Sequence, residues 1–154
     1  MGILIRRAGP TDTSVVPGIV LGPPSPVDTS TLGRLYFESY QAGIAASTEA
    51  EAVEDIELSF EGAYGVLDLK LSQVAWLGDQ LVGAVLVVER APWPDTPDCP
   101  FIIELFTSPA WRRRGIARSL LTTCLRMAGG RAGSASLRLR TVRRCPGGGL
   151  ARSA

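Results

Sequence analysis

The chain has 154 residues, of which 45% are hydrophobic and 20% charged, a composition that suits one globular domain with a buried core. It contains no histidine, which excludes Ser-His-Asp and Cys-His nucleophilic sites and argues against a zinc enzyme. The net charge is +1, but acidic and basic residues are separated along the chain: all fifteen acidic residues lie at or before Glu104, and eleven of the sixteen basic residues follow it. The C-terminal part is therefore suited to bind a polyanion.

The first half of the chain predicts one strand and two helices. A short strand is expected at residues 3–7, and the proline-rich residues 17–27 predict an irregular loop. Asp28 or Ser30 can cap a first helix, which continues with apolar and aromatic residues at helical spacing: Leu32, Leu35, Tyr36 and Tyr40. A capping-box pattern from Thr48 to Glu51 starts a second helix, which Gly62 and Gly65 end.

The second half predicts a hairpin, a buried strand, a helix and a last strand. Two valine-rich runs, 71–77 and 80–89, flank Gly78-Asp79 as in a β-hairpin. After a loop with four prolines, residues 100–107 read as a buried strand that stops before Pro109. A helix is expected from about 115 to 128, then a strand over 136–142. The order β-α-α-β-β-β-α-β predicts an α/β fold.

The turn from Arg112 to Ala117 is a candidate phosphate site. It lies between the buried strand and the start of a helix, where backbone N–H groups point outward and the helix dipole favours negative charge. Gly115 allows close approach of a ligand, and the arginines can add charge-assisted hydrogen bonds. A solvated basic turn and a small nucleic-acid-binding patch are the alternative interpretations. No aromatic residue follows Trp111, which favours a cofactor over single-stranded nucleic acid.

The pattern Arg112-x-x-Gly115-x-Ala117, with its preceding strand and Ser-Pro-x-Trp approach, resembles the signature of the GCN5-related N-acetyltransferases (GNAT). The resemblance covers residues 3 to about 141. It implies a mixed, mostly antiparallel twisted sheet with helices on both faces, no metal, and transfer of an acetyl group from acetyl-CoA to an amine of a small molecule or protein. The implied cofactor-binding residues are Leu105, Phe106, Thr107, Arg112, Arg113, Arg114, Gly115, Ile116, Ala117 and Arg118.

Glu104 is the candidate general base, as the one acidic residue in an apolar strand. Burial would raise its pKa toward the range in which a base works, and it resembles the strand glutamate that members of the family use. The alternative is a glutamate at the sheet surface paired with an arginine. The resemblance also implies that a backbone N–H near residues 105–107 polarises the thioester.

The resemblance ends near residue 141. The family continues with a helix that carries a tyrosine acting as general acid, followed by further strands, whereas residues 143–154 form a basic, glycine-rich sequence without tyrosine. We therefore expect one domain over 1–142 and a disordered tail over 143–154, produced by a frameshift or an early stop, or alternatively a natural short variant. Tyr36, Tyr40 and Tyr64 are expected in the core or in a substrate wall.

Two consequences follow from a fold that lacks its last helix and strands. The chain could be a catalytically impaired relic that still binds coenzyme A, which is the alternative to an active enzyme. An exposed sheet edge would also favour a homo-oligomer. The three scattered cysteines, the absence of a long apolar run and the charge order of the N-terminus predict a cytoplasmic protein with no membrane partner. The acceptor amine is not specified.

Overall fold

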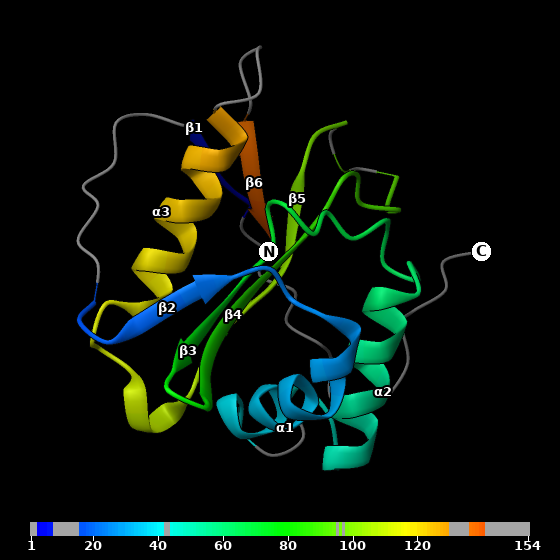
Figure 1. The fold of residues 1–154 in the computed structure, drawn as a ribbon. Coiled ribbons are helices and arrows are strands. Elements are labelled where there is room, and N and C mark those ends of the chain that lie inside the picture. The colour runs from blue at the N-terminus through cyan, green and yellow to red at the C-terminus, as the bar shows by residue number, and fades with distance from the viewer. Residues whose placement is uncertain are drawn as a thin grey trace.

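The computed structural model describes residues 3–7, 16–41, 44–94, 96, 98–129 and 136–140, the first and last of these as backbone alone. Its elements are β1 (Ile3–Arg7), β2 (Ile19–Gly22), η1 (Pro26–Asp28), α1 (Thr29–Ser39), α2 (Glu49–Phe60), β3 (Gln73–Leu77), β4 (Gln80–Val88), β5 (Phe101–Thr107), η2 (Pro109–Trp111), α3 (Ile116–Gly129) and β6 (Ser136–Arg140). The strands form one sheet in the order β1-β6-β5-β4-β3-β2 (Figure 1). Only β5 and β6 pair in parallel, so the predicted mixed, mostly antiparallel α/β fold is confirmed.

The sheet separates two hydrophobic cores, as the predicted placement of helices on both faces requires. Successive residues of β4 point to opposite faces: Leu86 and Val88 pack in the core that contains α1 and α2, whereas Val85 and Val87 pack in the core that contains α3. All four side chains are fully buried. Because both faces of β4 are covered, nearly all of its residues are apolar, as the sequence shows.

The local signals of the first half are largely confirmed. Thr48 Oγ1 accepts a hydrogen bond from the Glu51 N–H (3.2 Å), and a Glu51 carboxylate oxygen accepts one from the Ser47 N–H (2.8 Å), so the capping box starts α2. The helix ends before Gly62, whose φ of 87° is one that L-residues rarely adopt. Asp28 precedes α1, but its side chain makes no capping hydrogen bond.

The prediction of an irregular loop over 17–27 is wrong in part, because β2 lies within it. Residues Ile19–Gly22 pair antiparallel with β3, with Val20 opposite Trp76. The segment is only four residues long and lies between Pro17 and Pro23, so its sequence gives no recognisable strand pattern. Its partner strand lies some fifty residues further along the chain, so the pairing is a tertiary effect.

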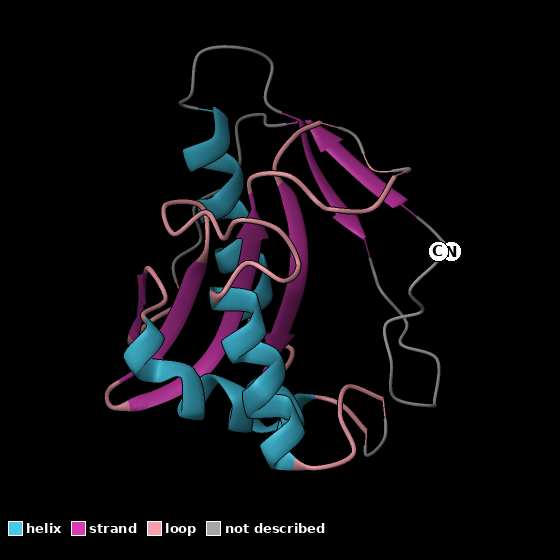
Figure 2. Cartoon of the chain, turned by 90° about the vertical axis from the view of Figure 1, so that its right-hand side faces the viewer, coloured by secondary structure: helices cyan, strands magenta, loops and turns pink. Residues whose placement is uncertain are grey.

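The N-terminal strand lies at the opposite edge of the sheet. β1 pairs antiparallel with β6, over Ile3 to Arg7 opposite Arg140 to Ser136. Among the described strands, β1 and β2 are the outermost, and the expected homo-oligomer through an exposed sheet edge stays a prediction. Figure 2 shows β1 and β6 together at the upper right, away from α1 and α2. The predicted end of the domain at 142 and the tail over 143–154 lie outside the described residues.

Candidate active site

Glu104 faces α1 because of an irregularity in β5. Leu86 pairs with Glu104, but Val87 pairs with Ile102, so Ile103 is the extra residue of a β-bulge. A bulge turns the following side chain relative to the regular alternation of a strand. Ile103 packs in the core of α1 and α2, and the Glu104 carboxylate reaches tyrosines on α1.

Two tyrosine hydroxyls donate to the Glu104 carboxylate, one to each oxygen. Tyr36 donates to Oε1 at 3.2 Å, and Tyr40 donates to Oε2 at 3.3 Å. The two rings pack edge to face, with centroids 5.4 Å apart. Tyr36 is buried, with 3% of its surface exposed, whereas Tyr40 is half-buried at the end of α1. Glu104 is thus half-buried beside α1, and the described contacts of its carboxylate include these two tyrosines.

The environment of Tyr40 keeps its hydroxyl protonated. Burial raises the pKa of Tyr40 above its ordinary value, and the charge of Glu104 and the hydrogen bond to it raise the pKa further. The nearby Arg112 guanidinium acts in the opposite direction. Tyr40 is therefore a hydrogen-bond donor throughout the physiological pH range.

Among the described residues, β5 pairs with β6 at Phe101 and Ile102. From Leu105 to Thr107, the side of β5 that faces β6 pairs with no described strand, and this side is called the open edge. Further along β5, the Ser108 N–H binds the Val82 carbonyl on the β4 side (2.8 Å), so by alternation the N–H groups of Leu105 and Thr107 point to the open side. Their carbonyls point the same way, and α1 contacts both: Tyr40 Oη lies 3.5 Å from the Leu105 oxygen. The end of α1 thus borders the open edge.

The turn before α3 has the backbone conformation of an anion site. Arg113 has a φ of 61° and Gly115 a φ of 86°, and backbone turns of this kind bring successive N–H groups together. The Ser119 N–H makes a helical bond to the Gly115 carbonyl (2.9 Å), which leaves the N–H groups of residues 116–118 without intrahelical acceptors. A ligand with negative charge fits at this helix start.

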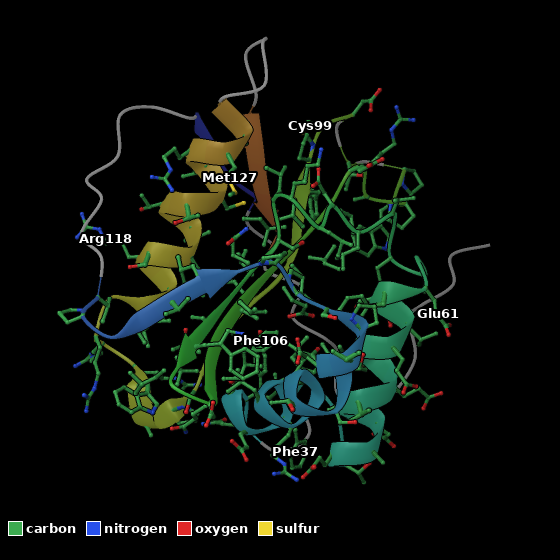
Figure 3. The ribbon with its side chains drawn as sticks, in the orientation of Figure 1. Phe37, Glu61, Cys99, Phe106, Arg118 and Met127 are labelled. Carbon is green, nitrogen blue, oxygen red and sulfur yellow. The ribbon has the colours of Figure 1, made fainter. Side chains whose placement is uncertain are left out.

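The arginines of the turn have different roles. Arg112 donates to the carbonyl of Ser39, the last residue of α1, where a cation stabilises the helix end. Arg114 stacks over the Trp111 ring at 4.6 Å from its centroid. Arg113 is exposed, and Arg118 projects from the first turn of α3 (Figure 3). Arg113 and Arg118 are therefore the side chains best placed to meet an anion.

An open pocket of about 450 Å³ connects the turn to the edge of β5. Nine of the ten predicted cofactor-binding residues line it: Leu105, Phe106, Thr107, Arg112, Arg113, Gly115, Ile116, Ala117 and Arg118. The exception is Arg114. Tyr40, which was expected in the core or in a substrate wall, also lines the pocket, as do Ser39 and Trp111, for which sequence reasoning missed this role. The four-residue spacing of Tyr36 and Tyr40 places both on one helix face and could have signalled a shared partner.

One buried atom in the pocket wall has no hydrogen-bond partner among the described residues. This atom is Thr107 Oγ1. Buried hydroxyls are nearly always paired, so an unpaired one at a pocket fits a polar ligand group. Across the same described residues, no group of three or more His, Cys, Asp or Glu side chains is placed to hold a metal ion, and no helix has the length and apolar character needed to cross a membrane.

Comparison with protein families identifies the fold. The model of the acetyltransferase (GNAT) family matches residues 34–144, which is more than half of the chain. The chain belongs to the GNAT family. The GNAT match includes the second half of α1, β5, the arginine turn and α3, and so includes every residue that lines the pocket. No curated protein sequence matches the chain.

Solved structures agree with the GNAT fold. A GCN5-related N-acetyltransferase from Sphaerobacter thermophilus aligns with a TM-score of 0.63 and 22% identity over 89% of this chain and 41% of that one. The aminoglycoside N-acetyltransferase AAC(6')-Iy, in complex with the bisubstrate analogue CoA-S-monomethyl-acetylneamine, aligns with a TM-score of 0.56 and 15% identity over 80% of both chains. A protein from Pyrococcus horikoshii aligns with a TM-score of 0.56 and 17% identity over 77% of this chain and 37% of that one. This chain therefore spans less than half the length of the Pyrococcus and Sphaerobacter proteins.

Proposed function

We propose that this GNAT protein is an acetyl-CoA-dependent N-acetyltransferase that acts on an amine of a small molecule or protein. The observation that carries the proposal is the single pocket that joins the arginine turn to the open edge of β5, beside the tyrosines that hold Glu104. The end of the pocket at the arginine turn suits an anion. The end at β5 offers backbone N–H donors, and the Glu104 carboxylate lies on the same strand. AAC(6')-Iy, which shares the fold, holds a CoA-based bisubstrate analogue.

The residues of the pocket fit the acetyl donor. Acetyl-CoA supplies an activated thioester and a negatively charged diphosphate. The N–H groups of residues 116–118 and the side chains of Arg113 and Arg118 would bind the diphosphate. The Thr107 hydroxyl would find its missing partner in an amide of the pantetheine arm. The Leu105 N–H would donate to the thioester oxygen and so stabilise negative charge as it develops there.

Glu104 would serve as the base. A carboxylate held by two tyrosine hydroxyls keeps a fixed orientation, which reduces the entropy cost of aligning it with an attacking amine. Each oxygen retains lone pairs that can accept a proton from the amine nitrogen. Glu104 and Leu105 follow each other in β5, so the proton acceptor and the backbone donor are on neighbouring residues.

The structure gives the nucleic-acid interpretation little support. Two of the three consecutive arginines are held by protein groups, Arg112 by the Ser39 carbonyl and Arg114 by the Trp111 ring. The impaired-relic interpretation differs from the proposal only in turnover, since both include coenzyme A binding. A turnover assay therefore distinguishes them.

The test combines binding with a broad acceptor screen. Purified protein is titrated with acetyl-CoA by calorimetry, and thiol release is followed with polyamines, aminoglycosides, amino acids and short peptides. We expect acetyl-CoA binding and amine-dependent thiol release. Binding without release by any amine would support the relic, and absence of binding would reject the proposal. Gly115→Asp provides a control in which both signals should fall.

A further inference from the structure

Tyr40 occupies the position between the candidate base and the candidate donor pocket. Its hydroxyl lies 3.3 Å from Glu104 Oε2 and 3.5 Å from the Leu105 carbonyl oxygen. The residue also lines the pocket, whereas Glu104 and Tyr36 do not. Since the Leu105 N–H and C=O both point to the open edge of β5, the Tyr40 hydroxyl lies on the side where the thioester would bind.

The end of α1 holds Tyr40 in place. The preceding residue, Ser39, donates through Oγ to the carbonyls of Leu35 (2.6 Å) and Thr107 (3.1 Å). Its own carbonyl accepts from Arg112. The Tyr36 ring packs edge to face against the Tyr40 ring. A side chain at a helix end would otherwise be mobile, and these contacts fix it relative to β5.

We propose that Tyr40 is a catalytic proton donor, which gives its hydroxyl proton to the departing thiolate and regains one from Glu104. The inference rests on the proposed acetyl transfer. It assigns this role to a residue at the C-terminal end of α1. The geometry that supports it is the contact of one hydroxyl with both the base and the pocket.

The proton balance is closed by these two side chains. The amine nitrogen bonds to the acetyl carbon and the carbon–sulfur bond breaks. The nitrogen proton passes to Glu104, the Tyr40 hydroxyl proton passes to sulfur, and the proton on Glu104 then passes to the Tyr40 oxygen. Nitrogen has lost one proton and sulfur has gained one, and both side chains return to their starting states. Because the raised pKa of Tyr40 disfavours a phenolate, protonated Glu104 beside it is needed to return the proton.

Tyr36 is the matched control. It donates to the same carboxylate at a similar distance (3.2 Å) and lies on the same helix. It is buried beside Phe106, with ring centroids 5.4 Å apart, and does not reach the pocket. Loss of its hydroxyl would remove a hydrogen bond that orients Glu104, whereas loss of the Tyr40 hydroxyl would also remove the donor to sulfur.

The first experiment measures rates and affinities of Tyr40→Phe and Tyr36→Phe. We expect Tyr40→Phe to lower the turnover number by about 100-fold or more, the usual effect of losing a general acid, with acetyl-CoA affinity nearly unchanged. Tyr36→Phe should lower it by about tenfold at most, because it removes one orienting hydrogen bond. Replacement of Tyr40 with 3-fluorotyrosine, which keeps the hydroxyl, should restore most of the rate. Equal turnover in wild type and Tyr40→Phe would overturn the inference and leave the proposed function intact.

The second experiment does not depend on turnover. Protein with 3-fluorotyrosine at position 40 is titrated with CoA and with desulfo-CoA, which lacks the sulfur, and the fluorine NMR signal is followed. We expect the two ligands to give different chemical shifts at position 40, and the same shift in a second sample that carries 3-fluorotyrosine at position 36 instead. Identical shifts at position 40 would show that its hydroxyl does not meet the sulfur. Failure of both ligands to bind would instead reject the proposed function and this inference with it.

Discussion

Replacement of Gly115 by aspartate tests the placement of the donor diphosphate. The site has room for a side chain, since a Cβ there would meet only Val16 Cγ2, at 3.5 Å. The φ of 86° makes any L-residue strained, at a cost of about 1 kcal/mol. Asparagine has nearly the same shape and the same strain without the charge, so the difference between Gly115→Asp and Gly115→Asn isolates electrostatic repulsion.

The repulsion can be estimated from the geometry of the turn. An aspartate carboxylate would stand about 4 to 6 Å from a phosphate bound at the start of α3, where two like charges repel by about 3 to 4 kcal/mol at an effective dielectric constant of about 20. The turn is exposed, so solvent and salt reduce this to about 1.5 to 3 kcal/mol. This corresponds to about 10- to 100-fold weaker binding of acetyl-CoA for aspartate than for asparagine.

Calorimetric titration with acetyl-CoA at low and high sodium chloride measures this difference. We expect the gap between the two variants to narrow at high salt, since mobile ions screen the repulsion. Both variants should melt a few degrees below wild type, because they share the backbone strain. Equal affinity of the aspartate and asparagine variants at low salt would place the diphosphate elsewhere and refute the reasoning.

Three further outcomes are expected. Glu104→Gln should lower amine-dependent turnover by about 100-fold while acetyl-CoA affinity stays close to that of wild type, and a rate unaffected by the change would remove Glu104 as the base. Gly33→Ala should destabilise the protein by about 1 to 3 kcal/mol in urea unfolding, because the new Cβ would lie 2.5 Å from the Val53 Cα on α2. Gly22→Ala is the control and should not destabilise it, since no described atom lies within 4 Å of a Cβ there. Burial raises the pKa of the Cys124 thiol to about 12. Between pH about 9 and pH about 12 the unfolded state loses this proton and the folded state keeps it, so the free energy of unfolding should fall as the pH rises through this range. In Cys124→Ala this part of the pH dependence should vanish, and an unchanged slope would contradict it.

Features set by neighbouring residues were predictable from the sequence. The capping box from Thr48 to Glu51 starts α2, and Gly78 turns the hairpin with a φ of 57°. The strand before Gly115 and the helix after it lie where the sequence predicts them. In each case the signal and the structure lie within a few residues, so the physical cause is contained in the local sequence.

Features set by distant residues were not predictable in the same way. β2 is a strand because β3 pairs with it, and the position of β1 depends on β6. The contact of Tyr40 with Glu104 joins residues 64 apart in the chain, and it depends on the bulge that turns the carboxylate toward α1. Arg112 lines the pocket, and the sequence did not indicate that it also donates to the end of α1. No local pattern specifies such pairings.

The hydrogen bonds of Ser39 have a consequence for the dynamics of the molecule. Through its hydroxyl and its carbonyl, this residue links α1 to β5 and to the arginine turn. Opening of the C-terminal end of α1 would break both bonds, so this end should exchange its amide hydrogens together with its partners in β5 and the turn. A ligand that binds at the turn would then also slow exchange at the C-terminal end of α1.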